Sequence, residues 1–521
     1  MAFLDFITNW VNGPDADSGR GLVLFGQAGT GKSTIAHEIA RLFDKVHRLT
    51  SSFIFSRSGQ SEQKAYLLFT TLARHLADRF PQFKIALGRV VEDKADLQDG
   101  TRDYHTLFES LILEPLKGLH IVGPILVVID ALDESGDATS KSKFRLHAFL
   151  AKNLIKLPSN FRVVITSRPE RPIVSAFNEA AEAQSVKIIS MDDNELAAHN
   201  HDDIIAFFQH KLRSDKLRCY VNALAIKAEG LFQWAAVASQ LILDEPARFK
   251  FDSEKCIKHL LKPSDKPSGR EDLLDELYSK VLEGYFFEFL DARNLFRSVV
   301  GQLITSFEPL SIRSLITLRK YASYDEHDDT AVTGTLRCLG SLLSNVNPTS
   351  TKRPTSSHDN HIPCSRHEDL PIIPLHTSFR DFLTDEKKSG DFYVDVHENH
   401  HQLAHACLGL LLDGLKFNIC ELETSYLAND DVKDLSTRVN QHIPPALLYA
   451  SRFWVHHLKH TDFKTDLFQK VETLFKEKFL FWLEILSLTR NIVHAPSAFA
   501  TLNMWLPSSD SSQGVSIKQV R

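Results

Sequence analysis

Short apolar runs alternate with amphipathic stretches over the first 190 residues of the chain. The apolar runs are rich in Val, Ile and Phe, as expected of parallel strands that are buried on both faces. We predict strands at residues 21–25, 52–55, 125–129, 161–166 and 186–189, and helices at residues 33–43, 63–80, 104–116, 142–157 and 172–181. This alternation predicts an α/β fold with a doubly wound parallel sheet that is covered by helices on both faces.

The strand signal fades after about residue 200, and helical apolar spacing replaces it. Asp202 is a suitable N-cap for the first of these helices. We predict helices at residues 202–212, 217–229 and 232–243, further helices over 272–321 with a break at 308–309, and a helical pattern over 399–501. The second part of the chain is therefore expected to be mainly α-helical.

Composition shifts divide the chain further. A polar stretch at 262–270 contains two prolines and a glycine, and residues 345–369 are rich in Ser, Thr, Pro and His, which predicts a flexible insert. We expect an N-terminal lead at 1–19, an α/β domain at 20–195, a helical domain at 196–262, a third domain at 270–388, a helical C-terminal domain at 390–504 and a disordered tail at 505–521.

Overall composition excludes several classes of protein. The 521 residues are 43% hydrophobic and 24% charged, which excludes wholesale disorder, and 60 basic against 66 acidic residues give a net charge of −6, so no general basic field favours direct nucleic-acid binding. Six cysteines stand far apart without a CxxC pair, and no apolar run approaches the roughly 20 residues of a membrane span. We expect a cytoplasmic protein without a membrane span.

Residues 26–33, Gly-Gln-Ala-Gly-Thr-Gly-Lys-Ser, match the phosphate-binding loop GxxxxGK[ST] between a predicted strand and a predicted helix. Glycines let backbone N–H groups turn inward around phosphates, Lys32 is expected on the β- and γ-oxygens, and Ser33 on Mg²⁺. Thr34 is expected near the α-phosphate. The predicted nucleotide-binding residues in this loop are Gly26, Gly29, Thr30, Gly31, Lys32, Ser33 and Thr34.

Charged residues follow two further predicted strands. Asp130 comes directly after the apolar run 125–129 and is expected to hold Mg²⁺ together with Ser33, while Asp133 or Glu134 is expected to polarise the attacking water. Arg168 follows the strand at 161–166 and is expected to detect the γ-phosphate.

Three segments together, GQAGTGKST, ILVVIDALDE and VVITSRPE, resemble the NACHT family of STAND NTPases, the nucleotide-binding modules of NLR-type receptors, and fungal members above all. The pattern Asp-small-x-Asp-Glu separates this family from most other phosphate-loop ATPases. Three later segments are also similar to fungal members: GLFQWA at 230–235, the winged-helix segment LHTSFRDFL at 375–383 and HxxLAxxCL at 400–408. The resemblance spans about residues 20–480.

The resemblance implies a P-loop NTPase domain at 20–195 followed by mainly α-helical domains, with a winged helix at 270–388. It further implies a signalling switch in non-self recognition, innate immunity or programmed cell death. ADP or GDP would hold the chain closed with His376 on the β-phosphate, and exchange for ATP or GTP with Mg²⁺ would permit self-oligomerisation before slow hydrolysis. The signalling partner stays open. Because Gly230-Leu-Phe232 stands where many animal members have GxP, the base also stays open.

Two alternatives belong to other functional classes. The first is an interaction scaffold that binds nucleotide without hydrolysing it, or a truncated NLR fragment, since only 25 residues precede the loop and no sensor repeats follow it. The second is a housekeeping phosphotransferase, which we rank last because the sequence shows no lid or acceptor pocket.

Several histidine patterns suggest metal binding, but we assign no further metal to them. Residues 397–401 spell HExxH, with Glu421 and Glu423 as conceivable third ligands, yet the HxxLAxxCL resemblance accounts for this stretch. The cluster of His358, His361, Cys364 and His367 lies in the predicted insert, so we expect only adventitious binding. A further group is expected to pack rather than ligate: His456, His457 and His460, beside Tyr449, Phe453 and Trp454.

Overall fold

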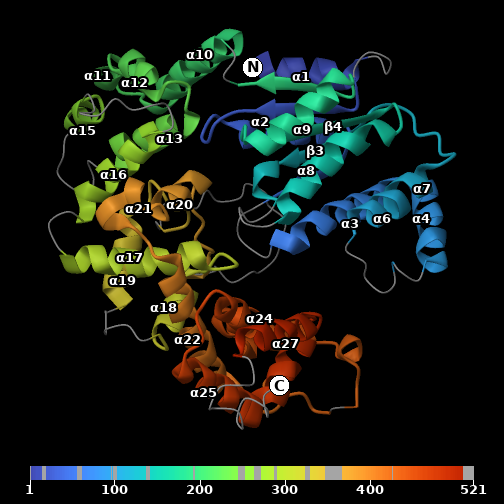
Figure 1. The fold of residues 1–521 in the computed structure, drawn as a ribbon. Helices are drawn as coiled ribbons and strands as arrows, with labels where there is room; N and C mark the ends of the chain where they lie inside the picture. Colours follow the sequence, from blue (N-terminus) through green and yellow to red (C-terminus); the bar gives the residue numbers. More distant parts are fainter. Residues whose placement is uncertain are drawn as a thin grey trace. The chain divides into compact units, whose positions relative to one another are not determined.

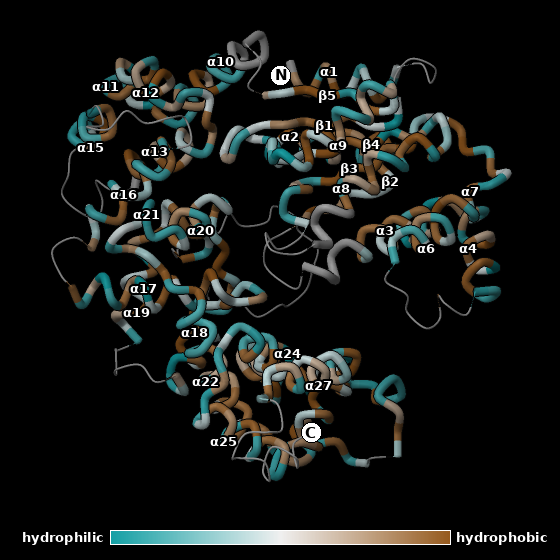
Figure 2. The backbone as a smooth tube through the Cα atoms, in the orientation of Figure 1, coloured by the Kyte–Doolittle hydropathy of each residue, from teal (hydrophilic) through white to brown (hydrophobic). Residues whose placement is uncertain are grey.

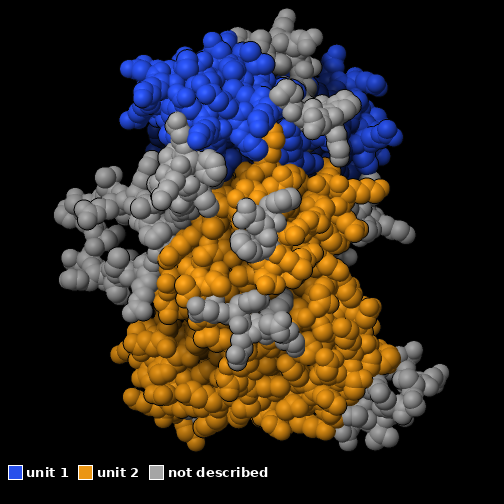
Figure 3. Space-filling model, turned by 90° about the vertical axis from the view of Figure 1, so that its left-hand side faces the viewer, with its two compact units in different colours: residues 1–277 blue, residues 278–521 orange. Residues whose placement is uncertain are grey.

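A computed structural model describes most of the chain as two compact units, residues 1–277 and 278–521 (Figure 3). The described residues are 2–13, 19–55, 61–94, 97, 103–135, 141–191, 194–244, 253–262, 272–286, 290–322, 329–346, 367–424 and 426–507. The predicted insert at 345–369 and the predicted tail at 505–521 lie largely outside these residues, as do His358, His361 and Cys364.

The first unit is built on a five-stranded sheet in the order β2-β3-β4-β1-β5, in which every pairing is parallel (Figure 1). The strands are β1 (Gly21–Phe25), β2 (Leu49–Ile54), β3 (Ile125–Asp130), β4 (Phe161–Ser167) and β5 (Val186–Ser190). All five predicted strands are confirmed, and so is the α/β class with a parallel sheet. The connection from β1 runs to β2 at one edge of the sheet, whereas the later connections run the opposite way, ending at β5 on the other side of β1. Such a reversal of strand order places a crevice at the carboxyl end of β1.

Alternate residues of the strands pack into two apolar layers, one on each face of the sheet. Leu22 and Leu24 of β1 face α1 and α2, while Val23 and Phe25 face the layer on the other side of the sheet. The layer with α1 (Ala2–Asn12) and α2 (Lys32–Lys45) buries Ile7 and Ile39. The opposite layer contains α3 (Ser61–Arg79), α4 (Pro81–Asp93), α6 (Tyr104–Phe108), α8 (Lys141–Asn153) and α9 (Arg171–Glu182). Figure 2 shows how these helices alternate between hydrophilic and hydrophobic positions along their length.

The first unit continues as a run of helices after the sheet. These are α10 (Asn194–Lys211), α11 (Asp215–Arg218), α12 (Val221–Ala228), α13 (Phe232–Asp244), α15 (Ser253–Leu260) and the first part of α16 (Asp272–Phe286). Trp234 and Ala235 of α13 are buried, as are Leu224 and Ala225 of α12. The mainly helical character predicted for this region is confirmed.

Three local expectations differ from the structure. The predicted lead at 1–19 contains α1, whose side chains Phe3, Ile7 and Trp10 belong to the sheet core. The expectation of Asp202 as an N-cap is wrong, because α10 begins at Asn194 and passes through this position. The predicted helix at 104–116 is divided into α6, a π-helical segment (Glu109–Leu113) and α7 (Glu114–Leu116).

Over the described residues of the second unit, the regular secondary structure is helical, apart from two isolated antiparallel bridges, Ser311 with Pro371 and Leu343 with Pro374. Its first helices after α16 are α17 (Leu290–Thr305), α18 (Ile312–Arg319), α19 (Asp329–Cys338), α20 (Thr377–Leu383) and α21 (Glu386–Ser389). The later helices are α22 (Val396–Gly414), α23 (Leu435–His442), α24 (Pro445–Lys459), α25 (Thr465–Thr473), a π-helical segment (Leu474–Lys478), α26 (Phe479–Leu488) and α27 (His494–Trp505).

The core of the second unit is centred on the packing of α22 against α24. Trp454 of α24 and Trp482 of α26 are buried edge to face, with ring centroids 5.9 Å apart, and the indole N–H of Trp482 donates to the Ser451 carbonyl at 2.8 Å. Helix α17 crosses α22 so closely that a Cβ atom on Gly301 would lie 2.5 Å from the Asn399 amide. Any larger residue at position 301 would therefore require the Asn399 side chain to move.

Within the described residues, no helix combines the length and the apolarity that a bilayer crossing requires.

Candidate functional site

The glycine-rich loop at residues 26–31 connects the buried strand β1 to α2 at the carboxyl edge of the sheet. Gly29 and Gly31 both have left-handed backbone angles, with φ of 81° and 96°. Residues other than glycine rarely adopt such backbone angles, so the glycines allow the loop to turn this tightly. The backbone N–H of Gly26 donates to the Ser167 carbonyl at 3.4 Å, which fixes the start of the loop against β4.

Two side chains of the loop brace it from within. Lys32 is the first residue of α2, and its Nζ atom donates to the carbonyls of Gly26 and Gln27, each at 2.7 Å. The buried Thr30 hydroxyl donates to the Gln27 carbonyl at 2.9 Å. The Lys32 ammonium group is thus held at the loop where it is predicted to bind phosphate.

The start of α2 offers backbone donors without a side-chain cap. Gly31 stands at the N-cap position and makes no side-chain hydrogen bond to the helix, so the first N–H groups of α2 have no capping acceptor there. Ser33 and Thr34 are exposed on the first turn. A helix start of this kind, with the positive end of its dipole, suits an anion.

The acidic segment lies at the end of β3, in the same edge of the sheet. Asp130 is buried as the last residue of β3, and the Thr166 hydroxyl of β4 donates to its carboxylate. Ala131 then adopts a left-handed conformation with φ of 56°, which turns the chain sharply. Asp133 and Glu134 follow in a short buried 3₁₀ turn (Leu132–Glu134).

Arg168 comes directly after β4 and contacts the acidic turn. Its backbone N–H donates to Asp133 Oδ1 at 3.0 Å, and its Nε atom lies 3.3 Å from Asp133 Oδ2. The structure thus joins two of the predicted residues into an ion pair of which the Asp133 side chain is only 3% exposed. Strand β4 lies between β1 and β3, so its end contacts both the glycine loop and the acidic segment.

The first turn of α13 contacts the glycine loop, which the sequence analysis did not predict. The backbone N–H of Gln233 donates to the Gly29 carbonyl at 3.0 Å, and a Cβ atom on Gly29 would lie 2.9 Å from that of Gln233. Phe232 lies 3.6 Å from the position of a Cβ atom on Gly31. The segment 230–235 was noted in the sequence only as part of a resemblance. Its pairing with the loop joins residues about 200 positions apart, which no local pattern reveals.

His376 belongs to the second unit, where it is the N-cap of α20. Its Nδ1 atom accepts the backbone N–H of Ser378 at 3.1 Å and lies 2.7 Å from the Ser378 hydroxyl, which in turn lies 2.8 Å from the hydroxyl of the buried Tyr278. Phe379 and Phe382 pack against the Tyr278 ring. Much of the segment 375–383 therefore has a clear role in capping and packing.

The histidines at 456–460 pack with aromatic side chains, in agreement with the interpretation from sequence. Phe307 contacts the rings of His400, His456, His457 and His460. His457 is fully buried, with Nδ1 2.9 Å from His400 Nδ1 and Nε2 2.8 Å from the Tyr449 hydroxyl. Burial, reinforced by neighbouring histidines, lowers the pKa of His400 to about 3 and that of His456 to about 4. These rings are neutral parts of the core at physiological pH.

A pocket of about 500 Å³ lies at the opposite, amino edge of the sheet. Among its lining residues, Arg48, Pro124 and Asn160 precede β2, β3 and β4. It is therefore separate from the glycine loop and the acidic turn.

Together the described residues define an α/β domain with an all-parallel sheet, followed by helical domains. Over residues 5–168 the chain is similar to the family described as Nephrocystin 3, N-terminal. The matched stretch runs from α1 to Arg168, so it contains the glycine loop and the acidic turn, and it covers less than half of the chain. A comparison with curated proteins finds no match.

Proposed function

We propose that the chain is a nucleotide-dependent signalling switch of the NACHT class of STAND NTPases. The observation that carries the proposal is the contact of α13 with the glycine loop. The Gln233 backbone holds the Gly29 carbonyl, and Phe232 lies beside Gly31. Through this contact, a helical segment beyond the sheet would move when the loop moves, which a switch requires and simple phosphoryl transfer does not.

The residues present fit a nucleotide with Mg²⁺. The start of α2 has backbone donors without a side-chain cap, and Lys32 adds a positive charge beside them. Lys32 would hold the β- and γ-phosphates, with Gly26, Gly29, Thr30, Gly31 and Thr34 forming the rest of the cradle; Ser33 and Asp130 would hold Mg²⁺. When bound, the nucleotide would supply the γ-phosphate whose slow hydrolysis resets the switch. The base, ATP or GTP, stays open.

Arg168 supplies a way to detect the γ-phosphate. Its guanidinium group is paired with Asp133 at the carboxyl edge of the sheet, close in sequence to the strand end that contacts Gly26. We propose that a triphosphate competes with Asp133 for Arg168, and that the change is passed to α13 and the helices after it. His376 would hold the β-phosphate in the closed state, and opening would lead to self-oligomerisation in the cytoplasm, in non-self or cell-death signalling.

The test is the nucleotide carried by the purified chain, released by acid and identified by chromatography. We expect about one ADP or GDP per wild-type chain and much less in Lys32→Ala, because a charged hydrogen bond to phosphate contributes about 1.5–3 kcal/mol, or about 10- to 150-fold in affinity. Lys45→Ala, at the exposed end of the same helix, is the matched control and should keep its nucleotide. A wild-type chain that arrives empty and binds neither Mg-ATP nor Mg-GTP would contradict the proposal.

A further inference from the structure

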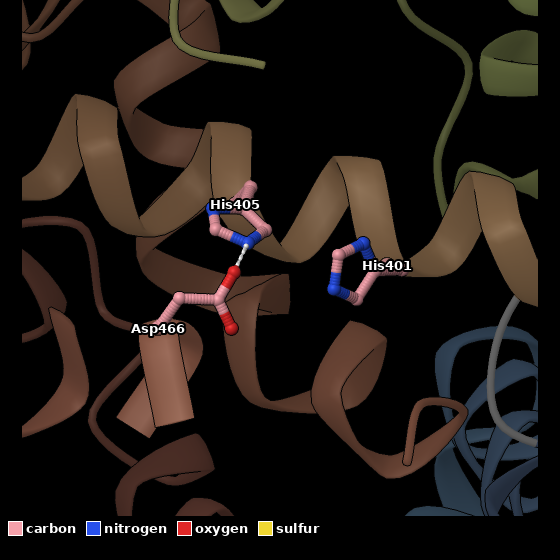
Figure 4. A group of neighbouring side chains, drawn as sticks. All are labelled: His401, His405 and Asp466. Atoms are coloured by element: carbon pink, nitrogen blue, oxygen red, sulfur yellow. Dashed lines mark hydrogen bonds and ion pairs between the residues drawn. The ribbon is translucent and has the colours of Figure 1, made fainter. Parts of the chain in front are cut away.

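Helices α22 and α25 bring together three side chains that can ligate a metal: His401, His405 and Asp466. The two histidines are one helical turn apart on α22, and Asp466 lies in the first turn of α25. One potential ligand atom from each residue lies within 4.8 Å of the other two. In Figure 4, His405 and Asp466 point toward each other and the His401 ring lies beside them.

His401 is the unusual member of this group. Its side chain is only 8% exposed, yet neither ring nitrogen has a hydrogen-bond partner among the described residues. A neutral imidazole carries one donor and one acceptor, and leaving a buried polar group unpaired costs about 1–3 kcal/mol. Such a group calls for a ligand, since buried polar atoms are otherwise almost always satisfied.

The other two members already form a contact. His405 Nε2 lies 2.8 Å from Asp466 Oδ2, and Lys470 Nζ donates to the His405 backbone carbonyl at 3.3 Å. The rings of His401 and His405 are 4.9 Å apart, edge to face. The carboxylate and both imidazoles thus share one small space between the two helices.

We propose that His401, His405 and Asp466 bind a late first-row divalent metal ion, Zn²⁺ above all, and that the ion fastens α25 to α22. Two imidazoles and a carboxylate are a donor set typical of Zn²⁺, whereas Ca²⁺ and Mg²⁺ prefer oxygen ligands alone. With zinc–ligand bonds of 2.0–2.2 Å, tetrahedral ligand atoms are about 3.3 Å apart, so a small movement of the His401 ring closes the site. Water would take the fourth position.

The charges around the site are mixed. Burial lowers the pKa of His401 and of His405, helped by Lys464 and Lys470 respectively, so both imidazoles are neutral ligands at neutral pH. Glu398 and Asp466 offset Lys464 near His401, and Asp466 offsets Lys470 near His405. One anionic and two neutral ligands leave a bound dication with a net positive charge, which the neighbouring lysines disfavour and Glu398 favours.

This site differs from the HExxH pattern in the same helix. That pattern pairs His397 with His401, but His397 is exposed and its Nε2 atom faces Asp462 at 3.7 Å. Neither Glu421 nor Glu423 belongs to the group of possible ligands: Glu421 Oε1 lies 4.0 Å from His442 Nδ1, and Glu423 Oε1 lies 3.9 Å from Arg438 Nη2. The three ligands therefore do not form the HExxH arrangement, and the inference is independent of the nucleotide.

The experiment titrates the full chain, stripped with a chelator and dialysed, with Co²⁺ followed by Zn²⁺. We expect one Co²⁺ per chain with the visible absorption of a four-coordinate site, displaced by Zn²⁺, and a higher melting temperature with Zn²⁺. His401→Gln should weaken binding by more than about 10- to 100-fold, the loss seen when even outer-shell partners are removed. His397→Gln, on the same helix, is the matched control and should bind as wild type does.

Asp466→Asn is the second variant in case His401→Gln does not fold, because the Asp466 side chain is 55% exposed and the change preserves its size. It should fold normally, lose Co²⁺ binding and lose the Zn²⁺-induced rise in melting temperature. Any of three results would overturn the proposal: a wild-type chain that binds neither ion at micromolar concentration, binding that persists in both variants, or binding that His397→Gln abolishes.

Discussion

Asp133 holds Arg168 through both of its carboxylate oxygens. The Arg168 backbone N–H donates to Oδ1 at 3.0 Å, and its Nε atom lies 3.3 Å from Oδ2. A carboxylate engaged in this way is less suited to polarise a water molecule, because its charge is already compensated. Of the two carboxylates proposed to polarise water, Asp133 is therefore the less suited, and its contacts position Arg168.

This division of roles predicts different effects for two neighbouring substitutions. Glu134→Gln should slow single-turnover hydrolysis by about 100-fold or more, as expected for the loss of a general base, while nucleotide binding and melting temperature change little. Asp133→Asn should lower the melting temperature, because the largely buried Arg168 loses its counter-charge. Rates measured with excess enzyme, together with thermal unfolding, separate the two variants. Unchanged slow hydrolysis in Glu134→Gln would argue against its role, and a wild-type chain that binds but never hydrolyses would favour the scaffold alternative.

Gly29→Ala should destabilise the first unit and weaken nucleotide binding. The new Cβ atom would lie 2.9 Å from the Gln233 Cβ at a φ of 81°, and Gln233 is itself anchored to the Gly29 carbonyl. We expect a loss of about 1–3 kcal/mol in the free energy of unfolding, measured in urea. Gly88→Ala is the control: Gly88 lies in α4 with open space around its Cβ position, so alanine should stabilise by up to about 1 kcal/mol. Equal effects of the two changes would show that the contact with α13 does not constrain the loop.

Two substitutions of His376 separate its capping role from its proposed contact with nucleotide. Asparagine is a good N-cap and alanine is a poor one, so only His376→Ala should lower the stability of the second unit, by about 1 kcal/mol. Both variants should release the bound diphosphate faster than wild type, because neither carries an imidazole. Release is followed by displacement with a fluorescent nucleotide. If His376→Asn retains nucleotide as wild type does, His376 is a cap alone.

The buried His456 predicts a pH dependence of stability. Burial, with His494 and other cations nearby, lowers its pKa to about 4, whereas an unfolded histidine titrates near its ordinary value of about 6.5. The unfolded chain therefore binds more protons between these values, so the contribution of His456 is fully present above about pH 6.5 and is lost as the pH falls toward 4. One such group contributes a slope of about 1.4 kcal/mol per pH unit.

Urea unfolding between pH 4.5 and 7.5 measures this slope. His456→Gln should reduce the slope of the free energy of unfolding against pH by the contribution of one proton. His397→Gln should leave the slope unchanged, because His397 is exposed. A His456→Gln curve parallel to that of wild type would show that His456 does not titrate as its burial implies.

The strands and the glycine loop could be predicted from sequence because their signals are local. Strands buried on both faces appear as continuous apolar runs, and the loop is a contiguous motif. The helix α1 was not predicted, but it could have been, since Phe3, Ile7 and Trp10 have helical spacing. In contrast, Asp202 has the residue type of an N-cap but lies inside α10, whose polar first half conceals where the helix begins.

The partners of the site residues could not be predicted in the same way. The pairing of Asp133 with Arg168 depends on the order of strands in the sheet, and the contact of Gln233 with Gly29 joins segments that are far apart in the sequence. Similarly, HExxH drew attention to His397 and His401, whereas the tertiary structure groups His401 with His405 and an aspartate from another helix. Spacing identifies residues on one helix face, but only packing selects their partners.

The position of β4 has a consequence for engineering this domain. Its last residues and the one that follows contact three different parts of the site: Thr166 contacts Asp130, Ser167 accepts from Gly26, and Arg168 pairs with Asp133. If the glycine loop and the acidic turn were transferred into another parallel sheet, they would therefore lose these contacts unless β4 was transferred with them. The smallest unit that can be transferred is therefore the carboxyl ends of three adjacent strands, β1, β4 and β3, although the glycine loop and the acidic turn follow only β1 and β3.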